Sequence, residues 1–306
     1  MNLLARLLPP QRQWDDPLFR SQVRLIRWGG SWAQLHDQTL YWALHAFALI
    51  VGTWLGLALV VRFVFYAGIF IPDTWFLVYT QDFWIAAAAA SVLAGLAVDF
   101  RAMTAGVPVI SSEITSGRYE LIRLTTVSPV QVIVSKYALA RVRAWRITAR
   151  VMWARALLAV LGLALLVWLW FSTGVGATTF DLLYAGGLLL VGACAAVVFV
   201  IEPYWRMKAI TALGVALSAR VINGVSATLA SALALLAFWF VQLVGVVALT
   251  FLLSSTLIFI AFGGVVLLVL VPLALGVLGA VVYGFYSMIQ RISLRHAAFR
   301  LAILEL

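Results

Sequence analysis

The chain has 306 residues, of which 65% are hydrophobic and only 10% are charged, and its mean hydropathy is +1.07. This composition excludes a soluble globular protein, because too few polar side chains are present to cover a water-facing surface. The formal net charge is +10, from 21 basic and 11 acidic residues, and the positions of these charges predict how the chain crosses a membrane.

The N-terminal segment 1–39 predicts a cytoplasmic region with an amphipathic helix. Within 18–32, apolar side chains fall on one helical face and arginines on the other. We expect an elbow helix that lies in the membrane interface with its arginines at lipid phosphates. It either braces the bundle and slides as the bundle opens, or serves only as an anchor. Its residues are Phe19, Arg20, Val23, Arg24, Ile26 and Arg27.

Four uncharged stretches of 24, 16, 25 and 20 residues follow. A helix needs about 20 residues to cross a bilayer. The stretches therefore predict four membrane spans, at about 40–61, 83–100, 152–171 and 182–201.

The next segment, 221–290, contains no charged residue and is long enough for two long spans or three short ones. With two spans, at about 221–245 and 263–290, 20 of the 21 basic residues fall on one side of the membrane. The positive-inside rule therefore predicts six spans with both termini in the cytoplasm. The fold class we expect is all-α, a polytopic bundle over 40–306, with short re-entrant or interfacial helices between 246 and 262.

The spans are rich in small residues and poor in polar ones. A stripe on the second span predicts that a neighbouring backbone approaches closely; it consists of Ala86, Ala90, Ala94, Ser91 and Gly95. Polar side chains look too sparse for an ion or proton path. The isolated His45 is best interpreted as a satisfied histidine at a helix contact.

The cytoplasmic loop 101–151 holds the most specific pattern. Gly117 is expected to break an extension of the second span, and 119–124 to form a short helix with an apolar ridge at Leu121, Ile122 and Leu124. Ser128 and Pro129 then suit the N-cap and first positions of a new helix, with Gln131 completing a capping box.

Basic side chains in both cytoplasmic loops are expected to face water or lipid headgroups. The second loop, 202–220, is either a further contact with a partner or an anchor at the membrane edge, with Trp205 at the interface and Arg206 and Lys208 in the water. In the first loop a basic face of the new helix is formed by Lys136, Arg143, Arg146 and Arg150.

No enzymatic constellation is found. Neither lysine follows a glycine, so there is no P-loop, and H-E-x-x-H and G-x-S-x-G are absent. The single cysteine, Cys194, cannot form a cysteine-based metal site. We predict no catalytic site, cofactor or metal, and if transport is ATP-driven, the ATPase is a separate subunit.

The loop resembles that of type-2 ABC exporter permeases, whose pattern there is I-x-x-E-x-x-x-G-T-x-E-L-L-x-x-T-P-L-S, followed by an isoleucine and G-K. The residues that carry the resemblance are Ile110, Glu113, Gly117, Glu120, Leu121, Thr125, Ser128, Ile133 and Lys136. Thr126 and Ser135 depart from it, standing where the family usually has proline and glycine, and Arg118-Tyr119 replaces the usual Thr-Trp or Thr-Tyr.

The resemblance implies a permease subunit in a prokaryotic cell membrane, paired with a second copy or a paralogue and with separate ATPase subunits. The short helix at about 117–125 would sit in a cleft of the ATPase. Glu113 and Glu120 would meet donors there, and Tyr119 and Leu121 would fill an apolar hole. The residues implied in coupling are Glu113, Gly117, Tyr119, Glu120, Leu121, Leu124, Thr125, Ser128, Pro129 and Lys136.

Two other functions stay open. A self-powered carrier or channel would need buried charges or broken helices near the membrane midplane. A membrane scaffold without transport activity would explain the composition but not the loop pattern. Membrane lipids are expected partners in every case and nucleic acid in none, while the transported substrate cannot be deduced from the sequence.

Overall fold

The structure, a computed structural model, describes residues 45, 48, 74–124, 127–172, 179–220, 224–260 and 267–304. Within these ranges every regular element is a helix, which confirms the predicted all-α class. Most of the first predicted span lies outside them. So do Thr125 and the predicted elbow residues Phe19, Arg20, Val23, Arg24, Ile26 and Arg27.

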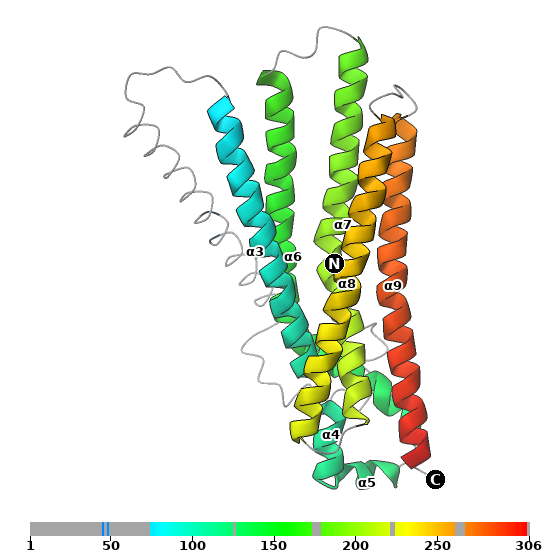
Figure 1. The fold of residues 1–306 in the computed structure, drawn as a ribbon. Coiled ribbons are helices and arrows are strands. Elements are labelled where there is room, and N and C mark those ends of the chain that lie inside the picture. The colour runs from blue at the N-terminus through cyan, green and yellow to red at the C-terminus, as the bar shows by residue number, and fades with distance from the viewer. Residues whose placement is uncertain are drawn as a thin grey trace, which may run out of the picture.

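Long helices run side by side, and two short helices lie at one end of the bundle, close to the C-terminus (Figure 1). The long helices are α3 (Thr74–Gly106), α6 (Pro129–Ser172), α7 (Thr179–Ser218), α8 (Gly224–Ile260) and α9 (Leu267–Leu304). The short ones are α4 (Pro108–Thr115) and α5 (Arg118–Arg123).

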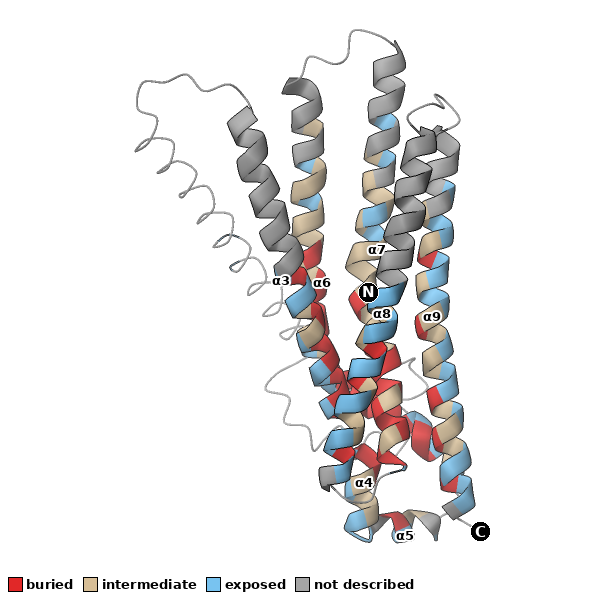
Figure 2. Ribbon diagram, viewed as in Figure 1, coloured by how far each residue is buried: buried red, intermediate tan, exposed pale blue. Residues whose placement is uncertain are grey.

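Four stretches of the described chain are long and apolar enough to cross a membrane: Ala90–Thr115, Pro129–Ala164, Ser226–Val244 and Leu275–Ile303. Among the residues whose burial is described, the buried ones lie mainly in the half of the bundle nearer α4 and α5 (Figure 2). Large apolar side chains of α8, such as Leu243 and Val244, are exposed on the outside. This outward apolar surface suits a membrane protein whose helices contact lipid.

The helices extend beyond the predicted spans. The predicted loop 101–151 is mostly helical, and the predicted second loop 202–220 is largely the continuation of α7. α8 runs without interruption to Ile260, so the short helices expected after residue 246 do not form in this part. No glycine or proline stands between Gly245 and Gly263 to end α8 earlier.

Helix α7 is the centre of the bundle, packing against α3, α6 and α9. It crosses α3 at two glycines, where a Cβ built on Gly106 would lie 2.9 Å from the carbonyl oxygen of Thr211 and 3.1 Å from the Cα of Gly214. Only a residue without a side chain permits this approach. At Gly95, in the predicted stripe, the nearest neighbour is instead a side chain, the guanidinium of Arg206.

Substitution of Gly106 by alanine tests this crossing. The added methyl group must push two backbones apart, so we expect Gly106→Ala to lower stability by about 1–3 kcal/mol. The measurement is the thermal unfolding midpoint of the detergent-purified protein. Gly276→Ala is the matched control, because a Cβ there meets nothing within 4 Å and alanine favours helix. Equal midpoints for the two variants would contradict the close approach.

Candidate functional site

A buried ion pair joins α3 to α7. The carboxylate of Asp99 is fully buried and accepts a hydrogen bond from Arg206 Nε at 2.5 Å and a second one from Arg206 Nη2. The indole Nε1 of Trp239 on α8 donates to Asp99 Oδ2 at 2.8 Å. Asp99 is therefore held by donors from two helices, as a buried carboxylate requires.

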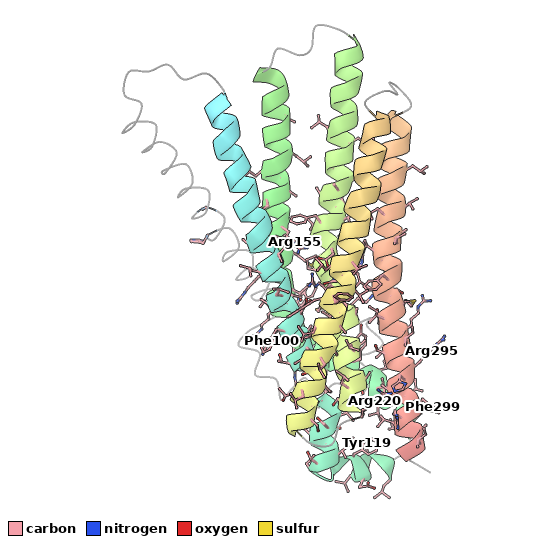
Figure 3. The ribbon with its side chains drawn as sticks, in the orientation of Figure 1. Phe100, Tyr119, Arg155, Arg220, Arg295 and Phe299 are labelled. Carbon is pink, nitrogen blue, oxygen red and sulfur yellow. The ribbon has the colours of Figure 1, made fainter. Side chains whose placement is uncertain are left out.

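A second carboxylate, Glu202, extends the network from α7 to α6 and α9. Its Oε2 lies 2.7 Å from Arg155 Nη1, and its Oε1 lies 3.6 Å from Arg206 Nη1. The Tyr286 hydroxyl donates to Oε1 at 2.6 Å and itself accepts from Gln242 Nε2 at 2.7 Å. All of the long helices α3, α6, α7, α8 and α9 thus contribute to one polar network. Figure 3 places Arg155 well above Tyr119 of α5, part-way along the bundle.

A proline in α7 explains one further contact of Arg155. Pro203 lies inside the helix and has no N–H, so the carbonyl of Phe199 loses its usual helical donor. Arg155 Nη1 donates to that carbonyl oxygen at 3.1 Å, and its guanidinium lies 4.7 Å from the centre of the Phe199 ring. The break that proline makes in the hydrogen-bond ladder is thereby satisfied from α6.

These contacts correct two predictions. Arg206 is not in water: its side chain is only 12% exposed and is paired with Asp99, so charges lie inside the bundle where polar groups were expected to be too sparse. Asp99, Arg155 and Glu202 were each interpreted as lying at the end of a span, and Arg206 as part of a loop. Two signals in the sequence pointed to burial: Glu202 and Arg206 stand one helical turn apart, and Asp99 immediately follows an apolar stretch.

Side chains of α6 and α7 also meet between the network and α4. The Tyr137 hydroxyl donates to the carbonyl oxygen of Lys208 at 3.2 Å, and Arg141 Nη2 donates to the Tyr204 hydroxyl at 3.1 Å. The ammonium of Lys208 lies 5.4 Å from the centre of the Tyr204 ring. Burial, and then the charge of Arg141, lower the pKa of Lys208. Lys208 is half-buried rather than in the water as predicted.

The predicted coupling segment starts where α4 leaves α3. Pro108 is the first residue of α4. The N-cap residue, Val107, makes no side-chain hydrogen bond to the start of the helix. Instead the buried Ser218 hydroxyl at the end of α7 accepts hydrogen bonds from the backbone N–H groups of Ile110 and Ser111, both at 2.9 Å. The start of α4 is thus capped from another helix.

An ion pair ties α4 to α6. Glu113 Oε1 contacts Lys136 Nζ, and the lysine side chain is only 3% exposed. The prediction that Lys136 belongs to a solvated basic face is therefore wrong, although Arg143, Arg146 and Arg150 are exposed as expected. Glu113 is engaged inside its own chain, which weakens its implied role in contacting another subunit.

Gly117 separates α4 from α5, as predicted, and its φ of +71° is a conformation that glycine adopts without strain. In α5 the side chains divide into two groups. Tyr119 is 5% exposed and is buried in a cluster that includes Ile133 of α6 and Leu301 of α9. Leu121 and Leu124 are 66% and 84% exposed. The implied role of Tyr119 in filling a hole on a partner is therefore not supported, whereas the leucines are accessible.

The start of α6 follows the predicted cap. The Ser128 hydroxyl accepts a hydrogen bond from the backbone N–H of Gln131 at 3.3 Å, and Pro129 is the first helical residue. The structure thus brings Glu113, Gly117, Tyr119, Ser128 and Lys136 together as one folded unit, with Glu120 exposed on α5.

Within the described residues no cluster of three or more histidine, cysteine or acidic side chains could hold a metal ion. Comparisons with protein-family models, curated proteins and solved structures find no match to this chain. The geometry of the network and of the α4–α5 unit is therefore the basis for the functional inference.

The Asp99–Arg206 pair predicts a non-additive pattern of stability. Arg206→Met leaves a buried carboxylate without its countercharge, so we expect a loss of about 3–5 kcal/mol. Asp99→Asn combined with Arg206→Met removes both charges and should be less damaging than Arg206→Met alone. Thermal unfolding of the purified variants measures both effects. A double variant that is as unstable as the sum of the two single variants would rule out the pairing.

The Glu113–Lys136 pair predicts rescue by charge exchange. Glu113→Lys places two cations together at a buried position and should loosen α4. Glu113→Lys with Lys136→Glu restores the opposite charges. Hydrogen–deuterium exchange of residues 108–123 should rise in the single variant and return towards the wild-type value in the exchanged one. Unchanged exchange in the single variant would show that the pair does not hold α4.

Proposed function

We propose that this chain is the transmembrane permease subunit of an ATP-driven ABC transporter of the exporter class, coupled through residues 110–129 to a separate ATPase subunit. The observation that carries the proposal is α5, a short helix with exposed Leu121 and Leu124 at one end of the bundle. Exposed leucines at a helix end require apolar cover, and a groove on a partner protein supplies it.

The topology we propose has an N-terminal elbow helix, six spans and both termini in the cytoplasm, with α4 and α5 on the cytoplasmic side. The helix segments on the far side of the polar network, away from α5, are each about 17 to 25 residues long, or roughly 25–38 Å. This length is close to the roughly 30 Å hydrocarbon thickness of a bilayer. The exposed arginines Arg143, Arg146 and Arg150 lie on the α5 side of the network, in agreement with the positive-inside rule.

The α4–α5 unit has the mechanical properties that coupling to an ATPase needs. It is fixed to α7 by the cap from Ser218, to α6 by the Lys136 ion pair and to α9 by the buried cluster that Tyr119 shares with Leu301. A force on the exposed leucines would therefore act on three long helices. A second permease copy or a paralogue would complete the transport path, in a prokaryotic cell membrane.

A self-powered carrier is the second candidate, because the buried network supplies the intramembrane charges that such a mechanism uses. Two carboxylates and two arginines neutralise one another there, which leaves no net charge for a coupling ion. A scaffold without transport activity would have no use for a surface helix braced on three others. The ATP-driven permease is therefore our preferred proposal.

The leucines of α5 give the decisive test. Leu121→Asp puts a charge into the proposed apolar contact, so we expect the affinity for a co-expressed ATPase subunit to fall roughly tenfold or more. Co-purification and nucleotide-dependent transport in proteoliposomes are the measurements. Thr104→Asp adds the same charge at an exposed site of α3 and should behave as the wild type.

Three results would distinguish the candidates. Transport that depends on the ATPase and is lost in Leu121→Asp supports the permease. Transport without any ATPase supports the carrier. An inserted Leu121→Asp variant with full co-purification and full coupling would refute the role of α5.

A further inference from the structure

We propose that a groove on α9 binds the headgroup and upper acyl chain of an anionic phospholipid. The groove has a volume of about 410 Å³. The residues that line it are Tyr283, Gly284, Ser287, Met288, Arg291, Ile292 and Arg295.

The lining divides into a polar part and an apolar part. Ser287, Arg291 and Arg295 follow one another at intervals of four residues, so they lie along one face of the helix and offer a hydroxyl and two guanidinium groups. Met288 and Ile292 form a parallel apolar line, and both are exposed. Such an arrangement fits a ligand that is itself divided into a phosphate and a hydrocarbon chain.

No acidic residue within α9 opposes the charge of its arginines. The helix contains no aspartate or glutamate from Leu267 to Leu304. Among the hydrogen bonds and ion pairs of the described residues, none involves Arg291 or Arg295. Figure 3 shows Arg295 on the outer side of α9, away from the centre of the bundle. Two neighbouring guanidinium groups repel each other, and an anion between them relieves the repulsion.

The upper end of the groove is built for an acyl chain. Gly284 leaves open space, since a Cβ built there meets no atom within 4 Å. The Tyr283 ring is held edge-on against Trp205 of α7, with 5.3 Å between the ring centres. Aromatic side chains of this kind are typical of the boundary between headgroups and hydrocarbon.

The depth of the site agrees with a lipid headgroup; this point rests on the membrane placement in the proposed function. Tyr286 belongs to the polar network at the inner edge of the proposed membrane core. Arg291 and Arg295 follow it by about 7 and 14 Å along the helix axis. These positions fall in the polar headgroup layer on the cytoplasmic side.

Binding there would act on the coupling end of the bundle. Leu301, fewer than two helical turns beyond Arg295, packs in the same buried cluster as Tyr119 of α5. A lipid that fixes this part of α9 would therefore also restrain the surface on which α5 rests.

The test compares phosphatidylglycerol with phosphatidylcholine of the same acyl chains, bound to the full-length protein and counted by native mass spectrometry. We expect the wild type to prefer phosphatidylglycerol and the variant R291Q/R295Q to lose about 10- to 30-fold of that preference. R291K/R295K keeps both charges and should retain most of it.

The matched control is R150Q/R300Q, which removes the same charge from exposed positions outside the groove. Arg300 stands about 180° around α9 from Arg291. Loss of the preference in R291Q/R295Q but not in the control supports the site. An equal loss of the preference in both variants overturns the site. So does no loss in either variant, which would follow if another segment of this chain or a second copy covers the groove.

Inorganic phosphate distinguishes a lipid from a soluble anion. It should not displace phosphatidylglycerol at matched phosphate concentration, because it cannot occupy the apolar line of Met288 and Ile292. Displacement by phosphate overturns the lipid assignment. None of these measurements uses an ATPase, so their outcome is independent of whether the proposed permease function holds.

Discussion

The ion pairs that surround Glu202 and Arg206 are the constraint on which the rest of the bundle depends. The two residues lie one turn apart on α7, and their partners come from α3, α6 and α9, with α8 attached through Trp239 and Gln242. A shift of any neighbour along α7 by one turn would leave a buried charge or donor without its partner, which is far more unfavourable than a change of apolar contacts. Apolar helices can pack in many registers, and here the polar groups select one.

The elements that depend on local chemistry could be predicted from the sequence. Gly117 interrupts the helix because it adopts a left-handed conformation, and Ser128 with Pro129 starts the next helix because each suits its position in the first turn. These effects act over three or four residues and require no knowledge of the fold. The membrane character likewise followed from composition alone.

The partners of the charged residues could not be predicted in this way. Asp99 and Arg206 are 107 residues apart in the chain, and Glu113 and Lys136 are 23 apart. A hydropathy profile treats each such residue as an unfavourable point and places a span boundary there. Burial of Tyr119 was hidden for a similar reason, since its neighbours Ile133 and Leu301 are brought to it only by tertiary packing. Long-range pairing is the information that a single sequence lacks.

The cap that Ser218 places on α4 determines how the unit at the end of the bundle responds to load. The backbone stays helical at Val107 between α3 and α4, but Pro108 has no N–H, so one hydrogen bond of the helical ladder is missing at this point. Ser218 and Lys136 attach α4 to α7 and α6 instead, on two sides. Two attachments to different helices restrain α4 and α5, whereas a single hinge would let them swing. A displacement of α5 is therefore passed through α4 to α6 and α7 together, as well as along the chain to α3.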